Sequence, residues 1–299
     1  MFSQADLAGA YTALVTPFSH DAAAVDLEAL DALVEAQIAG GVSGLIPCGT
    51  SGESPTLTKD EQKLVIRRTV RIAQGRVPVV AGTGSFSTEE TIATSLAAFE
   101  AGADAAMVVM PYYSRPTQAG LVEHVCRVAL AVKGPIVLYN IPARTGVDLG
   151  ADATEAICRR APNVVGLKDA TGNVLRCQEL VRRLGERLSI LSGDDALTLP
   201  MMASGARGVI SVVSNLLPGP VSELCRLALA YEYQKAQRVH FALLPVSEAM
   251  FLEANPAPIK WALAQKGMIK NVVRSPLVVA TEGVGHKIID AVQRFEAGS

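Results

Sequence analysis

The sequence predicts an α/β fold, a (β/α)8 TIM barrel over residues 1–217 followed by a C-terminal helical extension over residues 218–299. Short apolar segments alternate with amphipathic segments through the first part of the chain. Strands separated by single helices imply parallel βαβ units, and eight such units in roughly 210 residues fit a closed barrel. A doubly wound open sheet is the second interpretation.

Each predicted strand is a short apolar run of the kind that is buried on both faces of a parallel sheet. We expect the strands at 10–15, 44–47, 77–81, 105–110, 136–139, 164–167, 188–191 and 208–212. The segments between them carry apolar residues at helical spacing. We expect these helices at 26–39, 58–74, 87–101, 118–132, 153–160, 174–184 and 196–204.

Two helix starts carry the signature of a capping box, a hydroxyl residue followed three positions later by a glutamate. These pairs are Thr58 with Glu61 and Ser87 with Glu90. From residue 218 onward only helices are expected, at 221–230, 233–250, 258–266 and 283–295. No low-complexity linker precedes them, so we expect them to pack on the barrel that carries the active site and to serve subunit contacts.

The composition disfavours several functional classes. With a net charge of -2 and a pI near 6.1, the chain has no excess of positive charge for binding nucleic acid or an anionic membrane. The chain has no 18-residue apolar run, and its N-terminus shows no basic region followed by an apolar region. We therefore expect no membrane span, no signal peptide and a cytoplasmic protein. Its five cysteines show no C-x-x-C pair and its four histidines no zinc spacing. We therefore expect reduced thiols, no metal and no cofactor.

Lys168 directly follows the apolar run 164–167, at the end of the sixth predicted strand. Burial and a neighbouring charge can leave a lysine amine neutral near pH 7, and a neutral amine attacks carbonyls. Lys168 is therefore a candidate Schiff-base nucleophile. The alternative is a lysine that extends into solvent or pairs with Asp169.

In such a barrel the active site forms at the carboxyl ends of the strands. One lysine, several hydroxyl groups and two arginines gather there, a set that suits carbonyl chemistry on a carboxylate substrate. Taken alone, Gly49–Gly52 could be a simple turn, the two adjacent tyrosines a packing pair and Arg144 a surface ion pair. The residues that follow the strands are Thr16, Pro17, Thr50, Ser51, Gly52, Glu53, Gly82–Ser85, Tyr112, Tyr113, Arg115, Tyr139, Asn140, Arg144, Lys168, Gly193, Asp194, Asp195 and Ser211.

Four motifs resemble the dihydrodipicolinate synthase and N-acetylneuraminate lyase family, and the similarity covers nearly the whole chain. They are Gly49–Ser54, Pro111–Pro116, Leu138–Gly146 and Gly166–Asn173. The resemblance implies class I aldolase chemistry, in which pyruvate is held as an imine on a lysine, here Lys168, and is deprotonated to an enamine that attacks an aldehyde.

The resemblance also assigns roles to single residues. Tyr139 would donate and accept protons beside the lysine, with Thr50 and Tyr113 extending the relay and Tyr113 reaching into the neighbouring subunit. The substrate-binding residues would be Ser51 for a carboxylate, Arg144 for the carboxylate of the aldehyde, the backbone at Ile210 for pyruvate, and Gly193. Ser51 stands where family members commonly have a second threonine, which keeps the hydroxyl group and removes one methyl.

Within the family, the motifs around Arg144, Tyr112 and Lys168 favour the synthase branch. Its substrates would be pyruvate and L-aspartate 4-semialdehyde, its product 4-hydroxytetrahydrodipicolinate on the diaminopimelate route to lysine, and its assembly a homotetramer built as a dimer of dimers. Two alternatives stay open. One is a sibling aldolase or dehydratase that acts on N-acetylneuraminate or a 2-keto-3-deoxy sugar acid, and the other is a barrel without catalytic activity.

The resemblance places a possible effector site between subunits at Lys59, Phe86, Glu90 and Tyr112. Lysine-inhibited relatives often carry histidine and asparagine at the first two positions. A fixed positive charge at Lys59 repels lysine, and the ring of Phe86 offers no amide to its carboxylate. We therefore expect weak or no feedback inhibition by lysine.

Overall fold

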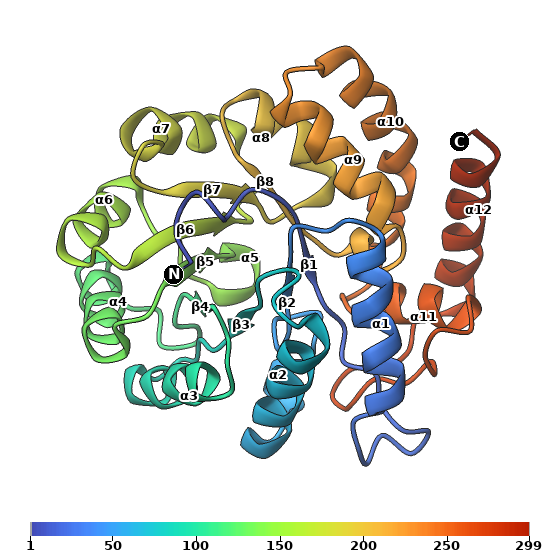
Figure 1. Ribbon diagram of the computed structural model, residues 1–299, viewed down its shortest axis with the longest axis horizontal. Helices are drawn as coiled ribbons and strands as arrows, with labels where there is room; N and C mark the ends of the chain where they lie inside the picture. The colour runs from blue at the N-terminus through green and yellow to red at the C-terminus, as the bar shows by residue number, and fades with distance from the viewer. Residues whose placement is uncertain (1, 299) are drawn as a thin grey trace.

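The computed structural model describes residues 2–298. Its strands form one parallel sheet in the order β2-β1-β8-β7-β6-β5-β4-β3. A bridge between Leu45 and Val79, together with the bond from the Gly82 amide to the Pro47 carbonyl, joins the two end strands. The sheet is therefore a nearly closed barrel (Figure 1), as predicted. The strands are β1 Gly9–Ala13, β2 Gly44–Ile46, β3 Val80–Gly82, β4 Ala105–Val109, β5 Ile136–Asn140, β6 Val164–Asp169, β7 Ser189–Ser192 and β8 Gly208–Ser211.

Helices surround the barrel and confirm the predicted alternation (Figure 1). Helix α5 and the short 3-10 helices were not predicted. The helices up to β8 are α1 Leu27–Ala39, α2 Lys59–Ala73, α3 Thr88–Glu100, α4 Gln118–Val132, α5 Pro142–Thr145, α6 Ala151–Arg160, α7 Val174–Leu184 and α8 Thr198–Ala203, with 3-10 turns η1 Ser54–Thr56 and η2 Asp195–Leu197. After β8 come η3 Val213–Asn215, α9 Pro218–Leu229, α10 Tyr233–Ala249, α11 Ala257–Gln265 and α12 Glu282–Gly298.

Only one of the two predicted capping boxes forms completely. The Thr58 hydroxyl accepts from the Glu61 amide, and the Glu61 carboxylate accepts from the Thr58 amide. Ser87 also caps its helix through the Glu90 amide. The Glu90 carboxylate, however, accepts from a lysine ammonium and a serine hydroxyl instead of the backbone of Ser87. In the second predicted box, the serine cap is therefore confirmed and the return bond from the glutamate is wrong, because the Glu90 carboxylate binds these two side chains instead.

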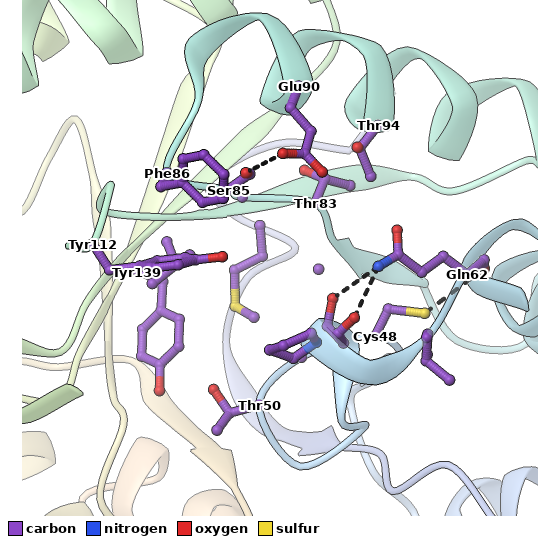
Figure 2. Close-up of a pocket in the computed structure, with 18 of the residues that line it drawn as sticks. Cys48, Thr50, Gln62, Thr83, Ser85, Phe86, Glu90, Thr94, Tyr112 and Tyr139 are labelled. Atoms are coloured by element: carbon purple, nitrogen blue, oxygen red, sulfur yellow. Dashed lines mark hydrogen bonds between the residues drawn. The ribbon is translucent and has the colours of Figure 1, made fainter. Parts of the chain in front are cut away.

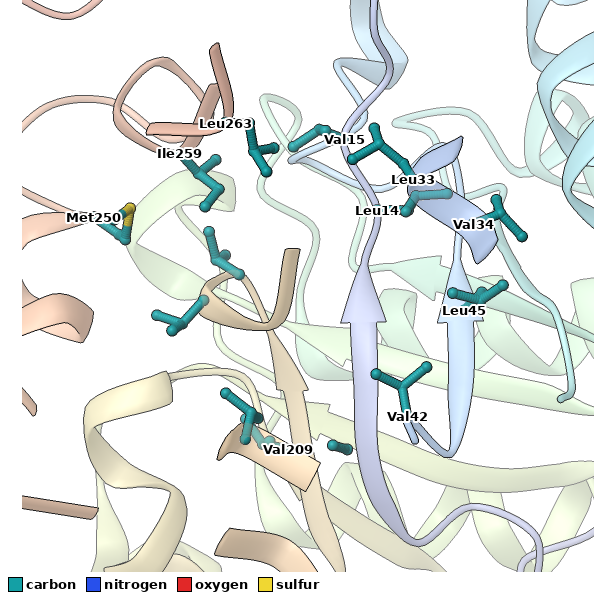
Figure 3. Close-up of a cluster of buried hydrophobic side chains, with 14 of the residues drawn as sticks. Leu14, Val15, Leu33, Val34, Val42, Leu45, Val209, Met250, Ile259 and Leu263 are labelled. Carbon is teal, nitrogen blue, oxygen red and sulfur yellow. The ribbon is translucent and has the colours of Figure 1, made fainter. Parts of the chain in front are cut away.

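The C-terminal helices pack on the barrel. Helix α9 contacts β1, β8 and α8, and so completes the outer ring of helices. Ile259 and Leu263 of α11 share one buried cluster with Leu14 and Val15, which directly follow β1 (Figure 3). This contact brings α11 to the carboxyl end of the barrel. The division of the chain at residue 217 stays a prediction.

Two further features concern the environment of the chain. Among residues 2–298, none of the helices has the length and apolar character that a membrane crossing needs. All five cysteines are free, and four of them are buried.

Candidate active site

Lys168 and Tyr139 lie side by side on neighbouring strands. They are register partners in the pairing of β6 with β5. The Lys168 ammonium nitrogen lies 4.3 Å from the centroid of the Tyr139 ring. Both residues are buried, with 5% and 4% of their surface exposed. The predicted nucleophile and its predicted proton-transfer partner are therefore in contact inside the barrel.

Asp169 does not pair with Lys168. Successive side chains of a strand point to opposite faces, and Asp169 Oδ2 lies 3.4 Å from Nε of Arg176, on helix α7. Its other oxygen accepts from the amide of Thr171 at 2.9 Å. Among the described residues, no carboxylate lies within ion-pair distance of the Lys168 ammonium group. The alternative of a lysine neutralised by the next acid is therefore wrong.

A cavity of about 570 Å³ opens beside Tyr139 at the carboxyl ends of β2 to β5. Thr50 lines it from the loop after β2, and Figure 2 shows the Thr50 and Tyr139 oxygens directed toward one another. Arg144 of α5 lines the same cavity. A hydroxyl pair and a guanidinium group therefore share one space next to the lysine.

Asn255 connects the two predicted carboxylate-binding residues. Its side-chain amide donates to the Ser51 hydroxyl oxygen at 3.0 Å, and its backbone carbonyl accepts from the Arg144 guanidinium group at 3.2 Å. Because the Ser51 oxygen accepts this bond, its own hydrogen stays available for a carboxylate. Asn255 is buried, and its side-chain oxygen has no hydrogen-bond partner among residues 2–298.

Gly193 directly follows β7, and Ile210 lies on β8, on the other side of Lys168 in the barrel. The Gly193 amide donates to the carbonyl of Asp169 at 2.7 Å, and a Cβ at Gly193 would lie 2.6 Å from that of Ala170. Ile210 is fully buried in β8, in the interior cluster that includes Tyr139. Neither residue lines the large cavity, so their contact with substrate stays a prediction.

Tyr113 lies away from the other catalytic candidates. It follows β4 with a φ of 69° and is 92% exposed. Within this chain it does not line the cavity that contains Thr50 and Tyr139. A role for Tyr113 in the reaction therefore requires a second subunit, as the resemblance implies.

The four predicted effector residues come together at the outer end of the same cavity. The Lys59 ammonium group lies 2.5 Å from Glu90 Oε1, and the Ser85 hydroxyl donates to Oε2 at 2.7 Å. The rings of Phe86 and Tyr112 meet edge to face, with centroids 5.7 Å apart (Figure 2). Both oxygens of the only acid in this cluster are already bonded.

No group of three or more histidine, cysteine, aspartate or glutamate side chains in residues 2–298 is arranged to hold a metal ion. What the site does offer is an amine, hydroxyl groups for proton transfer and donors for carboxylates. This set can form an imine with a 2-oxo acid and stabilise the charge that develops during the reaction.

Comparison with known proteins gives the family. The model of the dihydrodipicolinate synthetase family matches residues 6–294. This chain belongs to that family. A relative from Sorangium cellulosum, named 4-hydroxy-tetrahydrodipicolinate synthase, is 62% identical over 295 residues, which cover 99% of this chain and 98% of the relative.

Solved structures of the dihydrodipicolinate synthetase family have the same fold. The crystal structure of dihydrodipicolinate synthase from Aquifex aeolicus has a TM-score of 0.94 at 43% identity and covers 97% of this chain and 98% of its own. The chloride-inhibited synthase from Acinetobacter baumannii, complexed with pyruvate, has a TM-score of 0.95 at 40% identity and covers 97% and 99%. The predicted fold and family are therefore confirmed.

Two residues near the site, Asn255 and Lys260, were not predicted from the sequence as parts of it. Asn255 was given no role, whereas Glu53 was among the residues predicted to follow a strand at the active site. Lys260 was not considered for the site, although it forms a buried ion pair with Glu53. A lysine and an asparagine in otherwise apolar C-terminal segments were the available signal.

Proposed function

We propose that this chain condenses pyruvate with L-aspartate 4-semialdehyde to give 4-hydroxy-tetrahydrodipicolinate, through an imine on Lys168. The main observation behind this proposal is the contact between Lys168 and Tyr139, beside a cavity that Thr50 and Arg144 line. The name of the Sorangium relative supports this activity over that of a sugar-acid aldolase. An intact lysine, tyrosine and arginine in one site also argue against a barrel without activity.

In the first half of the reaction, the Lys168 amine attacks the ketone carbon of pyruvate. The resulting carbinolamine loses water after its hydroxyl group is protonated, and an imine remains. Tyr139 lies against the lysine, so its hydroxyl group can deliver and recover these protons, with Thr50 as the next member of the relay. Ser51 would hold the pyruvate carboxylate through the hydroxyl hydrogen that Asn255 leaves free.

In the second half, loss of a methyl proton converts the imine to an enamine, whose carbon attacks the aldehyde. The amino group of the semialdehyde then attacks the imine carbon, which closes the ring and releases Lys168. Arg144 would hold the semialdehyde carboxylate, because a guanidinium group donates two parallel hydrogen bonds to a carboxylate. Its anchoring on the carbonyl of Asn255 fixes where that carboxylate lies.

We further propose a cytoplasmic homotetramer built as a dimer of dimers, in which Tyr113 enters the site of a partner subunit. The exposure of its ring supports this assignment, because 92% of a tyrosine stays in water when only one chain is considered. Burial of large aromatic side chains is a major source of stability at subunit interfaces.

A coupled assay with pyruvate and L-aspartate 4-semialdehyde tests the proposed reaction. We expect turnover with these substrates and no release of pyruvate from N-acetylneuraminate or 2-keto-3-deoxy sugar acids. Arg144→Ala should lower kcat/KM for the semialdehyde by about 10-fold to 100-fold, the value of a charged hydrogen bond. The control is Arg160→Ala, which removes an exposed arginine that pairs with Glu123. Cleavage of a sugar acid without turnover of the semialdehyde would identify the sibling activity instead.

A further inference from the structure

The loop that carries Thr50 and Ser51 has an unusual backbone. Two residues that are not glycine, Cys48 and Glu53, adopt positive φ angles of 57° and 53° on either side of the two hydroxyl residues. A side chain in this region of φ is strained, and such a conformation persists only where the surrounding structure enforces it. Contacts with the surrounding structure must therefore hold this loop in place.

Glu53 is bonded to the loop and to the C-terminal part of the chain. Its amide donates to the carbonyl of Thr50 at 3.1 Å. Its carboxylate accepts from the Lys260 ammonium group at 2.6 Å through Oε1, and from the backbone amide of Arg274 at 2.8 Å through Oε2. Every partner of this carboxylate thus comes from residues more than 200 positions later in the chain.

The ion pair is completely enclosed. The side chains of Glu53 and Lys260 are both 0% exposed. The Lys260 ammonium group lies 4.2 Å from the centroid of the Phe18 ring, and the Arg274 guanidinium carbon lies 4.4 Å from the same ring. Burial lowers the pKa of Lys260 to about 8. Neither charge reaches solvent, so neither contributes to solubility.

Stability alone is a poor explanation for such a pair. The free energy needed to remove two charges from water is roughly as large as the free energy of their attraction. Proteins in which apolar residues of similar volume replace such a pair are therefore often as stable. What the pair does specify is geometry, because it fixes the position of Glu53 relative to α11. The Ser51 hydroxyl oxygen accepts its own bond from Asn255, which lies two residues before the start of α11.

We propose that Glu53 and Lys260 are positioning residues, which hold the loop 48–53 so that the Thr50 and Ser51 hydroxyl groups face the substrate. The proposal rests on the proposed function, since it assigns Thr50 to proton transfer and Ser51 to the pyruvate carboxylate. In this arrangement α11 is part of the active-site architecture. Arg144 lies on α5 and reaches this region only through its bond to the backbone carbonyl of Asn255, with no bond to Glu53 or Lys260. We therefore expect loss of the pair to affect binding of the semialdehyde less than binding of pyruvate.

The test is the double variant Glu53→Gln with Lys260→Met, which removes both charges at similar volume. The matched control is Asp31→Asn with Arg68→Met, which removes a partly buried ion pair between α1 and α2. For each, the melting temperature, the steady-state constants and the rate of borohydride-trapped imine formation are measured. We expect the pair variant to form the imine about 10-fold to 100-fold more slowly and to have a raised KM for pyruvate. Its KM for the semialdehyde should rise less than its KM for pyruvate, and all constants of the control should stay within about twofold of wild type.

A folded pair variant with wild-type imine formation and wild-type KM for pyruvate would overturn the proposal. So would a loss that raises the KM values of both substrates equally, because that result indicates general loosening. If the double variant does not fold, Glu53→Asp decides, since it keeps the charge and shortens the side chain by one methylene. A slowed imine step in Glu53→Asp supports positioning, whereas an unchanged rate contradicts it. Failure of the proposed function is distinguishable, because wild-type protein would then either form no pyruvate imine or form the imine without turning over the semialdehyde.

Discussion

The ammonium group of Lys168 lies over the ring of Tyr139, 4.3 Å from its centroid. The contact arises from the register of β5 and β6, in which the two residues are direct partners and point into the barrel together. A nucleophile and a proton carrier fixed on adjacent strands need little rearrangement to act. The first prediction concerns this pair.

Tyr139→Phe should lower kcat by about 100-fold to 10,000-fold, because it removes the proton carrier and keeps the ring that packs against Lys168. The measurement is steady-state turnover together with the melting temperature. Tyr11→Phe is the matched control, since the Tyr11 hydroxyl donates to the carbonyl of Asp6 before the first strand. Equal losses of turnover in the two variants would contradict a proton-transfer role for Tyr139.

Asn255 should control the binding of pyruvate through Ser51. Loss of the bond in Asn255→Ala should raise the KM for pyruvate by roughly 2-fold to 10-fold, the value of a single hydrogen bond. Asn255→Asp should raise it further, because a carboxylate accepts the Ser51 hydrogen and repels the substrate carboxylate. Steady-state kinetics at saturating semialdehyde measure both effects. A smaller KM in Asn255→Asp than in Asn255→Ala would refute this order.

Lysine should inhibit the enzyme weakly or not at all. The Lys59 ammonium group already forms an ion pair with the Glu90 carboxylate, and the Phe86 ring packs on Tyr112. Replacement of both residues, Lys59→His with Phe86→Asn, should free Glu90 and produce inhibition that wild type lacks. The measurement is the inhibition of both proteins as a function of lysine concentration. Half-maximal inhibition of wild type below about 1 mM lysine, a binding free energy near −4 kcal/mol, would refute the prediction.

Tyr113 should act in the site of a partner subunit. Lys168→Ala and Tyr113→Phe should each be nearly inactive alone. When the two variants are mixed under conditions that exchange subunits, activity should return. In a mixed dimer, the site with an intact Lys168 receives the intact Tyr113 of its partner. Absence of any recovery, with exchange verified by mass, would show that Tyr113 has no role across the interface.

Local patterns were enough to predict the barrel and its lysine. The apolar run 164–167 and the helical spacing on either side of it depend only on neighbouring residues. The strand predicted there formed, and it extends two residues further to include Lys168 and Asp169. Thr58 likewise formed its capping box from residues three positions apart. Features of this kind are encoded within short windows, which explains why they can be recognised in one sequence.

The contacts that hold the site could not be predicted in the same way. Ser51 and Asn255 are 204 positions apart, and Glu53 and Lys260 are 207 apart. No periodicity or motif spacing relates such residues, because their contact depends on how α11 packs against the end of the barrel. The half-formed capping box at Ser87 has the same origin, since Lys59 of another helix binds Glu90.

The most direct test of the account is the identity of the lysine that binds pyruvate. The protein is incubated with pyruvate, reduced with borohydride, digested and analysed by mass spectrometry. The account predicts one modified peptide, which contains Lys168, and no modification without pyruvate or in Lys168→Ala. An adduct on Lys133 or Lys260, or no adduct at all, would contradict it.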